Sequence, residues 1–247
     1  ILAAGLRLLT PEAAKNRQEK KRRIWAAVEE NAAEIERIAR TVYEHPELGY
    51  KENFGTEFVA GELQRLGLEV ETGIAVTGVR AFSSKTASGP RIAIMGELDS
   101  IILPDHPAAD KATGAVHACG HHLQIGAMMG AAIGLVRSGV LEELDGVVEF
   151  LAVPAEEYVE LGYRAGLKER GEISFFGGKQ EMIKRGLFDS LDAVMMIHSL
   201  DQREGGTKFI VGPEGNGFIG KNVHFIGVPS HAGAAPEKGV NALNAAM

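Results

Sequence analysis

Apolar residues in the first part of the chain recur at the spacing of an α-helix. Those that fall on one face are Ile24, Val28, Ile35, Ile38 and Val42. Thr10-Pro11 is a typical helix start, because the threonine side chain can cap the helix and proline suits its first position. We therefore predict a long amphipathic helix that ends near His45-Pro46. We predict a second helix from about Glu52 to Leu66, ending at Gly67.

Three short apolar runs follow later in the chain, at residues 91–95, 147–153 and 193–197. Their length, and the helices predicted between them, indicate buried strands of a largely parallel sheet. Residues 70–82 also have the composition of strands, interrupted by two glycines. The predicted fold class is α/β, with a largely parallel mixed sheet flanked by helices.

A helix predicted from about His122 to Arg137 carries Gly126, Gly130 and Gly134 on one face. Such a face is typical of membrane dimerisation or of close packing. The longest apolar stretch covers only residues 123–136, whereas a spanning helix needs ~20 residues. We therefore predict no membrane span, and we expect the glycine face to pack on the sheet.

The last part of the chain, residues 218–247, reads as a strand at 223–228, a loop rich in small and polar residues, and a helix that begins near Gly239. The chain stops inside that helix without a cap. We therefore expect it to be the front part of a longer protein, with the beginning of a second, smaller domain at this end.

Composition and charge exclude some classes of function. The 247 residues are 45% hydrophobic and carry a formal net charge of -7. A mildly acidic chain is a poor candidate for binding nucleic acid or an anionic membrane through its overall field. Cys119 is the single cysteine, so no intrachain disulfide can form. This favours the cytoplasm, although a secreted or periplasmic protein without disulfides stays possible.

Side chains suited to metal binding follow each of the three predicted strands. Asp99 comes after the first strand, Glu156-Glu157 after the second and His198 after the third. Cys119 and His121 lie where a loop enters the glycine-faced helix. Because the carboxyl ends of parallel strands meet at one edge of a sheet, we expect these residues to converge. Thiolate, imidazole and carboxylate are the usual protein ligands of zinc and similar metals.

Each of these residues also has a structural interpretation. A lone cysteine is usually a small buried apolar residue, and a Glu-Glu pair is usually solvated surface. Their joint position at matching strand ends favours a metal site over these interpretations. His45, His106 and His224 have no such convergence, and we interpret them as structural or surface residues.

Six short motifs occur in the order found in a known family. They are His45-Pro46-Glu47-Leu48-Gly49-Tyr50, Gly96-Glu97-Leu98-Asp99, His117-Ala118-Cys119-Gly120-His121, Pro154-Ala155-Glu156-Glu157, His198 and Gly227-Val228-Pro229-Ser230-His231-Ala232. With these motifs the chain, from about Tyr43 to its end, resembles the aminoacylases, hippurate hydrolases, plant auxin-conjugate hydrolases and aminobenzoyl-glutamate hydrolases. These are dinuclear metal-dependent amidohydrolases, distantly related to carboxypeptidase G.

The resemblance implies a role for each matching residue. It implies metal ligands at Cys119, His121, Glu157 and His198, a general base at Glu156, a supporting carboxylate at Asp99 and a substrate-binding histidine at His231. It implies two divalent ions, zinc or manganese, with cobalt or nickel as alternatives. It also implies a catalytic domain over 1–213, the start of an α+β lid and dimerisation domain over 214–247, with the boundary near Gly212 to Gly217, and a homodimer formed through the lid.

The expected reaction is hydrolysis of the amide bond of an N-acyl or N-aroyl amino acid by water that the two ions activate and Glu156 deprotonates. Two alternatives stay open: a metallo-exopeptidase that acts on short peptides, and a metal-binding protein without activity. The sequence departs from the family at His122, where aspartate is common, and in a long stretch over 158–176. The last histidine ligand of the relatives lies beyond the end of this chain.

Overall fold

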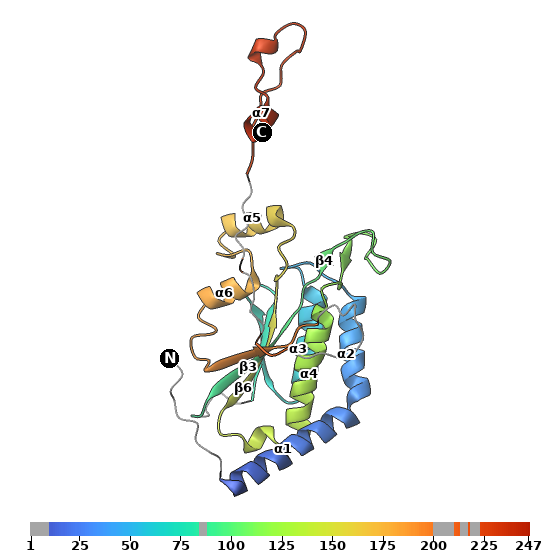
Figure 1. Cartoon of the computed structure of the whole chain (residues 1–247), viewed down its shortest axis with the longest axis vertical. Helices are drawn as coiled ribbons and strands as arrows, with labels where there is room; N and C mark the ends of the chain where they lie inside the picture. Colours follow the sequence, from blue (N-terminus) through green and yellow to red (C-terminus); the bar gives the residue numbers. More distant parts are fainter. Residues whose placement is uncertain (1–9, 84–87, 200–209, 213–216, 218–222) are drawn as a thin grey trace. The chain divides into compact units, whose positions relative to one another are not determined.

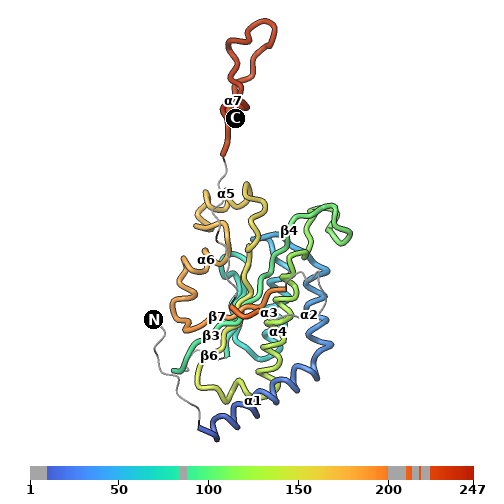
Figure 2. The backbone as a smooth tube through the Cα atoms, in the orientation of Figure 1, coloured from blue at the N-terminus to red at the C-terminus, as the bar shows by residue number. Residues whose placement is uncertain are grey.

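The computed structural model of the chain describes residues 10–83, 88–199, 210–212, 217 and 223–247. The chain divides into two compact units, residues 1–201 and 202–247, which are described separately below. The first unit contains the sheet and most of the helices, as the ribbon and the backbone tube show (Figures 1 and 2). It therefore carries all of the residues that we expect to bind metal.

The N-terminal part forms three helices, α1 (Pro11–Glu30), α2 (Ala32–Glu44) and α3 (Asn53–Arg65). The predicted start is confirmed, because the Thr10 side chain accepts the N–H of Ala13 at 3.2 Å. The single long helix that we predicted is wrong, because the helix breaks at Asn31 (φ -111°, ψ 15°). The Asn31 side chain donates to the Ala27 carbonyl at 2.6 Å. Asparagine competes in this way with the backbone bonds of a helix, so the chain turns there.

Within the described residues the main sheet has five strands in the order β1-β2-β6-β3-β7. They are β1 (Glu69–Ile74), β2 (Gly78–Phe82), β6 (Val147–Val153), β3 (Arg91–Glu97) and β7 (Ala193–Met196). Strand β3 pairs in parallel with β6 and β7, whereas β1, β2 and β6 pair antiparallel. The predicted mixed sheet flanked by helices is confirmed.

Helix α4 (His121–Arg137) lies between the sheet and the layer formed by α1 and α2 (Figure 1). A Cβ atom on Gly126 would lie 2.9 Å from the side chain of Ala39 in α2, and Gly130 and Gly134 likewise face α2 and α1. Our prediction that this face packs on the sheet is therefore wrong. The close approach to the sheet comes instead from Gly96 of β3, where a Cβ would lie 3.0 Å from the α4 backbone.

The main core lies between the sheet and the helices α2, α3 and α4. Its largest buried members include Phe150, Ile38, Leu63, Met129 and Ile133. Two further helices follow β6, namely α5 (Leu161–Glu169) and α6 (Gly178–Lys184). Helix α6 lies across the sheet from α4 (Figure 1), where its Met182 packs on Val153. The carboxyl end of β6 is thus enclosed by helices that come from both sides of the sheet.

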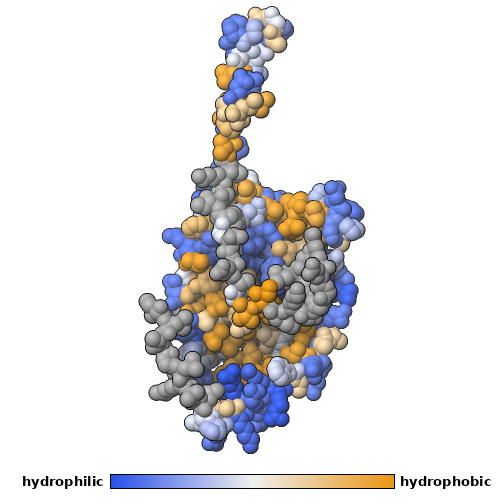
Figure 3. Space-filling view, viewed as in Figure 1, coloured by the Kyte–Doolittle hydropathy of each residue, from blue (hydrophilic) through white to orange (hydrophobic). Residues whose placement is uncertain are grey.

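Strand β7 differs from the prediction of a buried strand. It lies at the edge of the sheet, and its side chains are 36% to 59% exposed at Met195, Met196 and Val194. Figure 3 shows hydrophobic surface in the middle of the corresponding face of the molecule. An apolar run therefore predicts a strand, but it does not predict how far other elements bury that strand.

In the second unit, the strand predicted over 223–228 is wrong. Among its described residues, Val228 forms an isolated antiparallel bridge with Val240, and no longer ladder extends from it. A 3₁₀ turn (Pro236–Lys238) precedes helix α7 (Ala242–Ala246), which the Asn241 side chain caps. Within the residues that the structure describes, no helix combines the length and the apolar character needed to cross a membrane.

Candidate metal centre

The carboxyl ends of β3 and β6 lie side by side and place the candidate residues. The parallel register pairs Glu97 with Val153, so that Asp99 and Glu156 both leave the same edge of the sheet. Strand β7 pairs with β3 in the same direction and ends at Met196, two residues before His198. The topology that the apolar runs predicted therefore brings the three strand ends together.

Cys119 and His121 flank the turn that begins helix α4. The turn needs glycine, because Gly120 has φ 96° and a Cβ there would overlap the side chain of Ser199. The Cys119 Sγ atom lies 3.7 Å from Nε2 of His198. One ligand atom from each of Cys119, His121 and His198 lies within 4.8 Å of the others. A thiol and two imidazoles from separate segments thus share one small volume.

His121 is the centre of the cluster and is 1% exposed. Its Nδ1 lies 2.8 Å from the carbonyl oxygen of Asp99, and its Nε2 lies 2.9 Å from Oε2 of Glu97. The same Nε2 is 3.9 Å from a carboxylate oxygen of Glu156 and 3.9 Å from one of Glu157. Burial opposes protonation of the ring, but Asp99 and Glu97 outweigh burial and raise the pKa of His121 to about 11. Without a metal, a proton therefore compensates these carboxylates.

Asp99 joins two of the predicted ligands. It is fully buried, its Oδ2 accepts the backbone N–H of Glu157 at 2.9 Å, and its Oδ1 lies 3.4 Å from Nδ1 of His121. Contacts of this kind fix the orientation of a histidine ligand. His122, where the family commonly has aspartate, does not take this place. Its ring lies 4.9 Å from that of Tyr43 and 5.7 Å from that of His117, measured between centroids.

Glu156 and Glu157 remain accessible, with side chains 36% and 22% exposed. Burial and the nearby carboxylates of Glu97 and Glu157 raise the pKa of Glu156 above its ordinary value. Burial and the adjacent Glu157 raise the pKa of the Cys119 thiol to about 11. In the absence of a metal the thiol is therefore protonated at neutral pH, as the crowding of acidic groups requires.

Two residues of this cluster were missed by the sequence analysis. Glu97 is 1% exposed, and one of its oxygens falls within 4.8 Å of ligand atoms of His121 and Glu156. Burial opposes its ionisation, but contacts with His121 and Lys179 outweigh burial and lower the pKa of Glu97 to about 2. The Lys179 ammonium is paired with Glu97 and lies 3.8 Å from Glu156. Glu97 lies in the Gly96-Glu97-Leu98-Asp99 motif, from which we predicted a role for Asp99 alone. No feature of the sequence distinguishes Lys179 from a surface lysine.

His231 is the predicted site residue that the described contacts do not bring to this cluster. It belongs to the second unit, where its Nδ1 accepts the backbone N–H groups of Gly233 and Ala234 at 3.2 and 3.0 Å. Its role in binding substrate stays a prediction.

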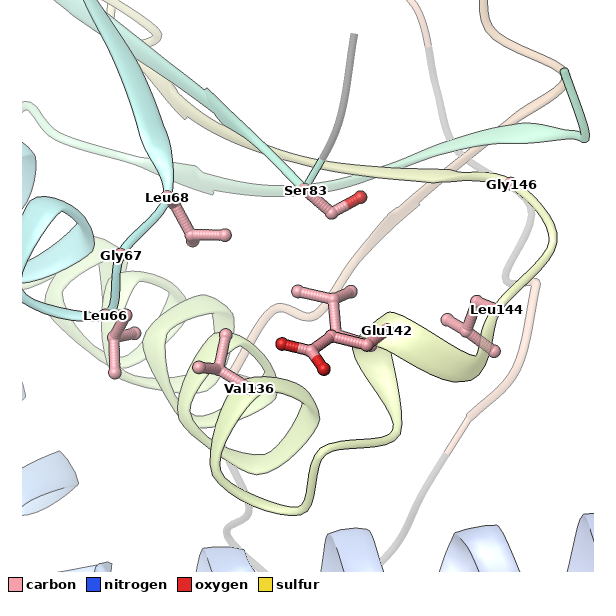
Figure 4. A pocket seen from close by; sticks show the side chains of 9 residues that line it. Leu66, Gly67, Leu68, Ser83, Val136, Glu142, Leu144 and Gly146 are labelled. Atoms are coloured by element: carbon pink, nitrogen blue, oxygen red, sulfur yellow. The ribbon is translucent and has the colours of Figure 1, made fainter. Parts of the chain in front are cut away.

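Two of the recesses in the described part of the first unit lie away from the cluster. One, of about 330 Å³, is at the opposite end of β6 and is lined by Leu68, Val136, Glu142 and Gly146 among others (Figure 4). The other, of about 520 Å³, is an apolar groove between α2 and α4. Neither contains a residue of the cluster.

The donor set fits a transition-metal ion. Thiolate and imidazole suit borderline ions such as Zn²⁺, and carboxylates complete the usual ligand set. The two groups of donors share His121: Cys119 and His198 form one, and Glu97 and Glu156 form the other. Glu157 lies beside both, 3.9 Å from His121 and close enough to Cys119 to raise the pKa of its thiol. The arrangement can hold positive charge and still leave a carboxylate facing solvent.

Comparison with known proteins gives the following similarities. No family model matches the chain. It is 31% identical over 168 residues to thermostable carboxypeptidase 1 of Saccharolobus solfataricus, covering 66% of this chain and 38% of the relative. It is 31% identical to IAA-amino acid hydrolase ILR1-like 6 of Arabidopsis thaliana, covering 68% of this chain and 33% of that relative. It is 30% identical to N-acetyl-L-cysteine deacetylase of Bacillus subtilis, covering 66% of this chain and 35% of that relative. The chain thus spans little more than a third of the length of the curated relatives.

Solved structures agree with these similarities. The chain is similar to the YXEP protein of Bacillus subtilis, described as a dinuclear metal-binding peptidase of the M20 family, with a TM-score of 0.51 and 26% identity over 66% of this chain and 41% of the other. An aminobenzoyl-glutamate utilization protein of Klebsiella pneumoniae has the same fold, with a TM-score of 0.51 and 16% identity over 69% of this chain and 44% of the other. The family resemblance that the motifs carried is confirmed.

Proposed function

We propose that this chain forms the metal-binding part of an enzyme that hydrolyses the amide bond of N-acyl or N-aroyl amino acids. The premise is that the chain is homologous to the dinuclear metal-dependent amidohydrolases and peptidases. One observation carries the proposal. Donor atoms of Cys119, His121 and His198 lie within 4.8 Å of one another, and Glu156 and Glu157 reach the same imidazole from the next strand.

Cys119, His121, Glu157 and His198 are the residues that we assign to metal binding. We propose two divalent ions, with zinc or manganese first and cobalt or nickel as alternatives. When bound, such ions supply Lewis-acid catalysis and lower the pKa of a water molecule. The thiolate favours a borderline-soft ion. Asp99 orients two of these ligands, because it contacts both the His121 ring and the Glu157 backbone.

Glu156 is the residue that we assign as general base. It is partly exposed, lies next to the proposed ligands, and has a raised pKa. A carboxylate with a pKa closer to neutrality both accepts a proton from the attacking water and returns it to the leaving nitrogen more readily. His231 is proposed to contact the substrate from the second domain, and that domain is proposed to form the homodimer; these two assignments follow from the family resemblance.

The test is a panel of N-acetyl, benzoyl and aminobenzoyl amino acids, assayed with the full-length gene product and added zinc or manganese. Glu156→Gln is expected to lower kcat by at least about 10³-fold while the metal content stays the same, because the amide keeps the shape but cannot take a proton. Glu160→Gln is the matched control, since Glu160 lies four residues away and pairs with Lys51 instead. Near-normal turnover in Glu156→Gln would exclude its role as the base.

A second candidate is a metallo-exopeptidase that acts on short peptides. It is favoured by the relative named thermostable carboxypeptidase, whose identity to this chain equals that of the plant hydrolase. The two candidates use the same metal-binding residues and differ in the pocket for the substrate. Adding dipeptides and carboxypeptidase substrates to the panel separates them by the ratio of kcat/KM values. Metal binding without turnover of any member would instead indicate a protein without catalytic activity.

A further inference from the structure

The residue before the proposed general base has an unusual backbone conformation. Ala155 has φ 51° and is fully buried between β6 and Glu156. Residues other than glycine rarely adopt a positive φ, and they keep it only where the surroundings enforce it. The contacts of Ala155 therefore determine the direction in which the chain leaves the sheet.

A buried carboxyl group holds the N–H side of Ala155. Oε1 of Glu52 accepts this N–H at 2.7 Å, and the hydroxyl of Thr77 donates to Oε2 of the same side chain. Glu52 is the N-cap residue of α3, where a charged residue is usually exposed, but here its side chain is fully buried. The bond therefore joins two segments that are about one hundred residues apart in the chain.

The carbonyl side of Ala155 is held as well. Its oxygen accepts the N–H of Gly178 at 3.0 Å and a guanidinium N–H of Arg164 at 3.4 Å. Arg164 is fully buried and also donates to the Phe176 carbonyl at 2.8 Å. Gly49 closes the remaining side, because a Cβ there would lie 2.8 Å from the Ala155 Cα atom. Little space is left for the turn to relax.

Buried carboxyl groups thus accept the backbone N–H groups of both residues that flank Glu156. Glu52 accepts the N–H of the preceding residue, and Asp99 accepts the N–H of the following residue, Glu157, at 2.9 Å. The Glu156 side chain itself stays partly exposed. Its direction, and that of Glu157, is consequently set through the backbone.

We propose that Glu52 is a positioning residue, which fixes the strained turn at Ala155 and so directs Glu156 and Glu157 toward His121. The inference rests on the proposed function, because it assigns Glu52 a role in the geometry of that site. Displacement of a catalytic group by about 1 Å can lower a rate by ~10²-fold. The role needs a hydrogen-bond acceptor and not a charge. Burial and the nearby Asp99 raise the pKa of Glu52 to about 8, and a glutamine oxygen can accept the Ala155 N–H in the same way.

The test uses three variants of the full-length protein. Glu52→Leu removes the acceptor, Glu52→Gln keeps an acceptor for Ala155, and Glu62→Leu is the matched control. Glu62 is also a buried glutamate of the α3 segment, but it pairs with Arg37 and Arg65, away from the site. We measure kcat and KM, the visible absorption spectrum of the cobalt-loaded protein, and the midpoint of thermal unfolding.

Glu52→Leu is expected to lower kcat by ~10²-fold with KM within about twofold, and to change the cobalt spectrum because Glu157 moves. Glu52→Gln is expected to stay within about threefold of the wild type in kcat and to keep its spectrum. Glu62→Leu is expected to lower the unfolding midpoint but to keep both kcat and the spectrum. This pattern separates a positioning role from a general loss of stability.

Wild-type kcat and spectrum in folded Glu52→Leu would overturn the inference, as would an equal loss of kcat in Glu62→Leu. If Glu52→Leu does not fold, Thr77→Val replaces it, because it removes one contact of the carboxyl group and leaves the group in place. A fall in kcat of about fivefold is then expected, and an unchanged kcat contradicts the inference. A wild-type protein without activity would refute the proposed function, whereas the cobalt spectra would still test the position of Glu157.

Discussion

Two clusters of acidic groups lie on the same sheet and are neutralised differently. Glu149, in the middle of β6, is fully buried and is held by two guanidinium groups, those of Arg80 at 2.8 and 2.9 Å and of Arg91. The cluster at the carboxyl edge contains the carboxyl groups of Glu97, Asp99, Glu156 and Glu157, the thiol of Cys119, and the basic groups of His121, His198 and Lys179.

The difference distinguishes a structural cluster from a binding site. Glu149 and Glu71, which lies 3.7 Å from Arg80, face two arginines, so this network needs no further charge. Among the described residues of the edge cluster, four carboxyl groups meet one ammonium group and the imidazoles of His121 and His198, which leaves an excess of acid, together with a thiol whose pKa is raised to about 11. Burying like charges is unfavourable unless a cation or protons compensate them. The excess of acid in the edge cluster supports the proposed metal ions, whereas the Glu149 cluster needs no added cation.

One variant from each cluster tests whether the edge cluster binds metal while the Glu149 cluster only stabilises the fold. His121→Ala is expected to weaken zinc or manganese binding by at least about 10³-fold, since the ring contacts both donor groups. Glu149→Leu is expected to lower the unfolding midpoint, because it removes the buried carboxylate that the two guanidinium groups share, and to keep the metal content. Metal content by mass spectrometry and thermal unfolding are the measurements. Loss of metal in Glu149→Leu, or retention in His121→Ala, would remove the distinction.

The pH dependence of metal affinity tests the ligands that we assign in the edge cluster. The pKa values of His121 and Cys119 are raised to about 11, so both groups are protonated at pH 7 in the metal-free protein. Both must lose a proton to become ligands, and lower pH therefore favours the metal-free form. Affinity is expected to rise about 100-fold per pH unit between pH 6 and 8, because about two protons are released for each bound metal. Calorimetry in two buffers with different ionisation enthalpies measures this number. A pH-independent affinity without proton release would contradict the assigned ligands.

The sequence predicted much of this arrangement, because apolar runs and the residues directly after them are local features. The run at 147–153 is strand β6 over the same residues, and the positions after β3, β6 and β7 meet as expected. Periodicity states which residues share a face but not which neighbour that face meets. For this reason the glycines of α4 turned out to face α1 and α2.

Two of the residues that the sequence did not single out, Glu52 and Lys179, share one property. Glu52 and Lys179 act on partners that are far away in the sequence, namely Ala155 and Glu97. Each stands at the beginning of a helix, where a charged residue is ordinary. Only the folded chain shows that Glu52 is fully buried and that Lys179 is paired with a buried carboxylate. Long-range contacts of this kind leave no pattern in the local sequence.

Among the described residues of the edge cluster, Lys179 is the cation that is not a candidate ligand, and its substitution is expected to have a small effect. Its ammonium is paired with Glu97 and lies 3.8 Å from Glu156, so it compensates part of the acidic excess and competes with a metal ion. Lys179→Met keeps the length of the side chain and removes its charge. We expect metal affinity to rise about three- to tenfold, measured by competition with a chelating dye. Lys184→Met, at the other end of the same helix, is the control. If Lys179→Met instead weakens metal binding, the lysine supports the site, and the acidic excess is smaller than the comparison with Glu149 indicates.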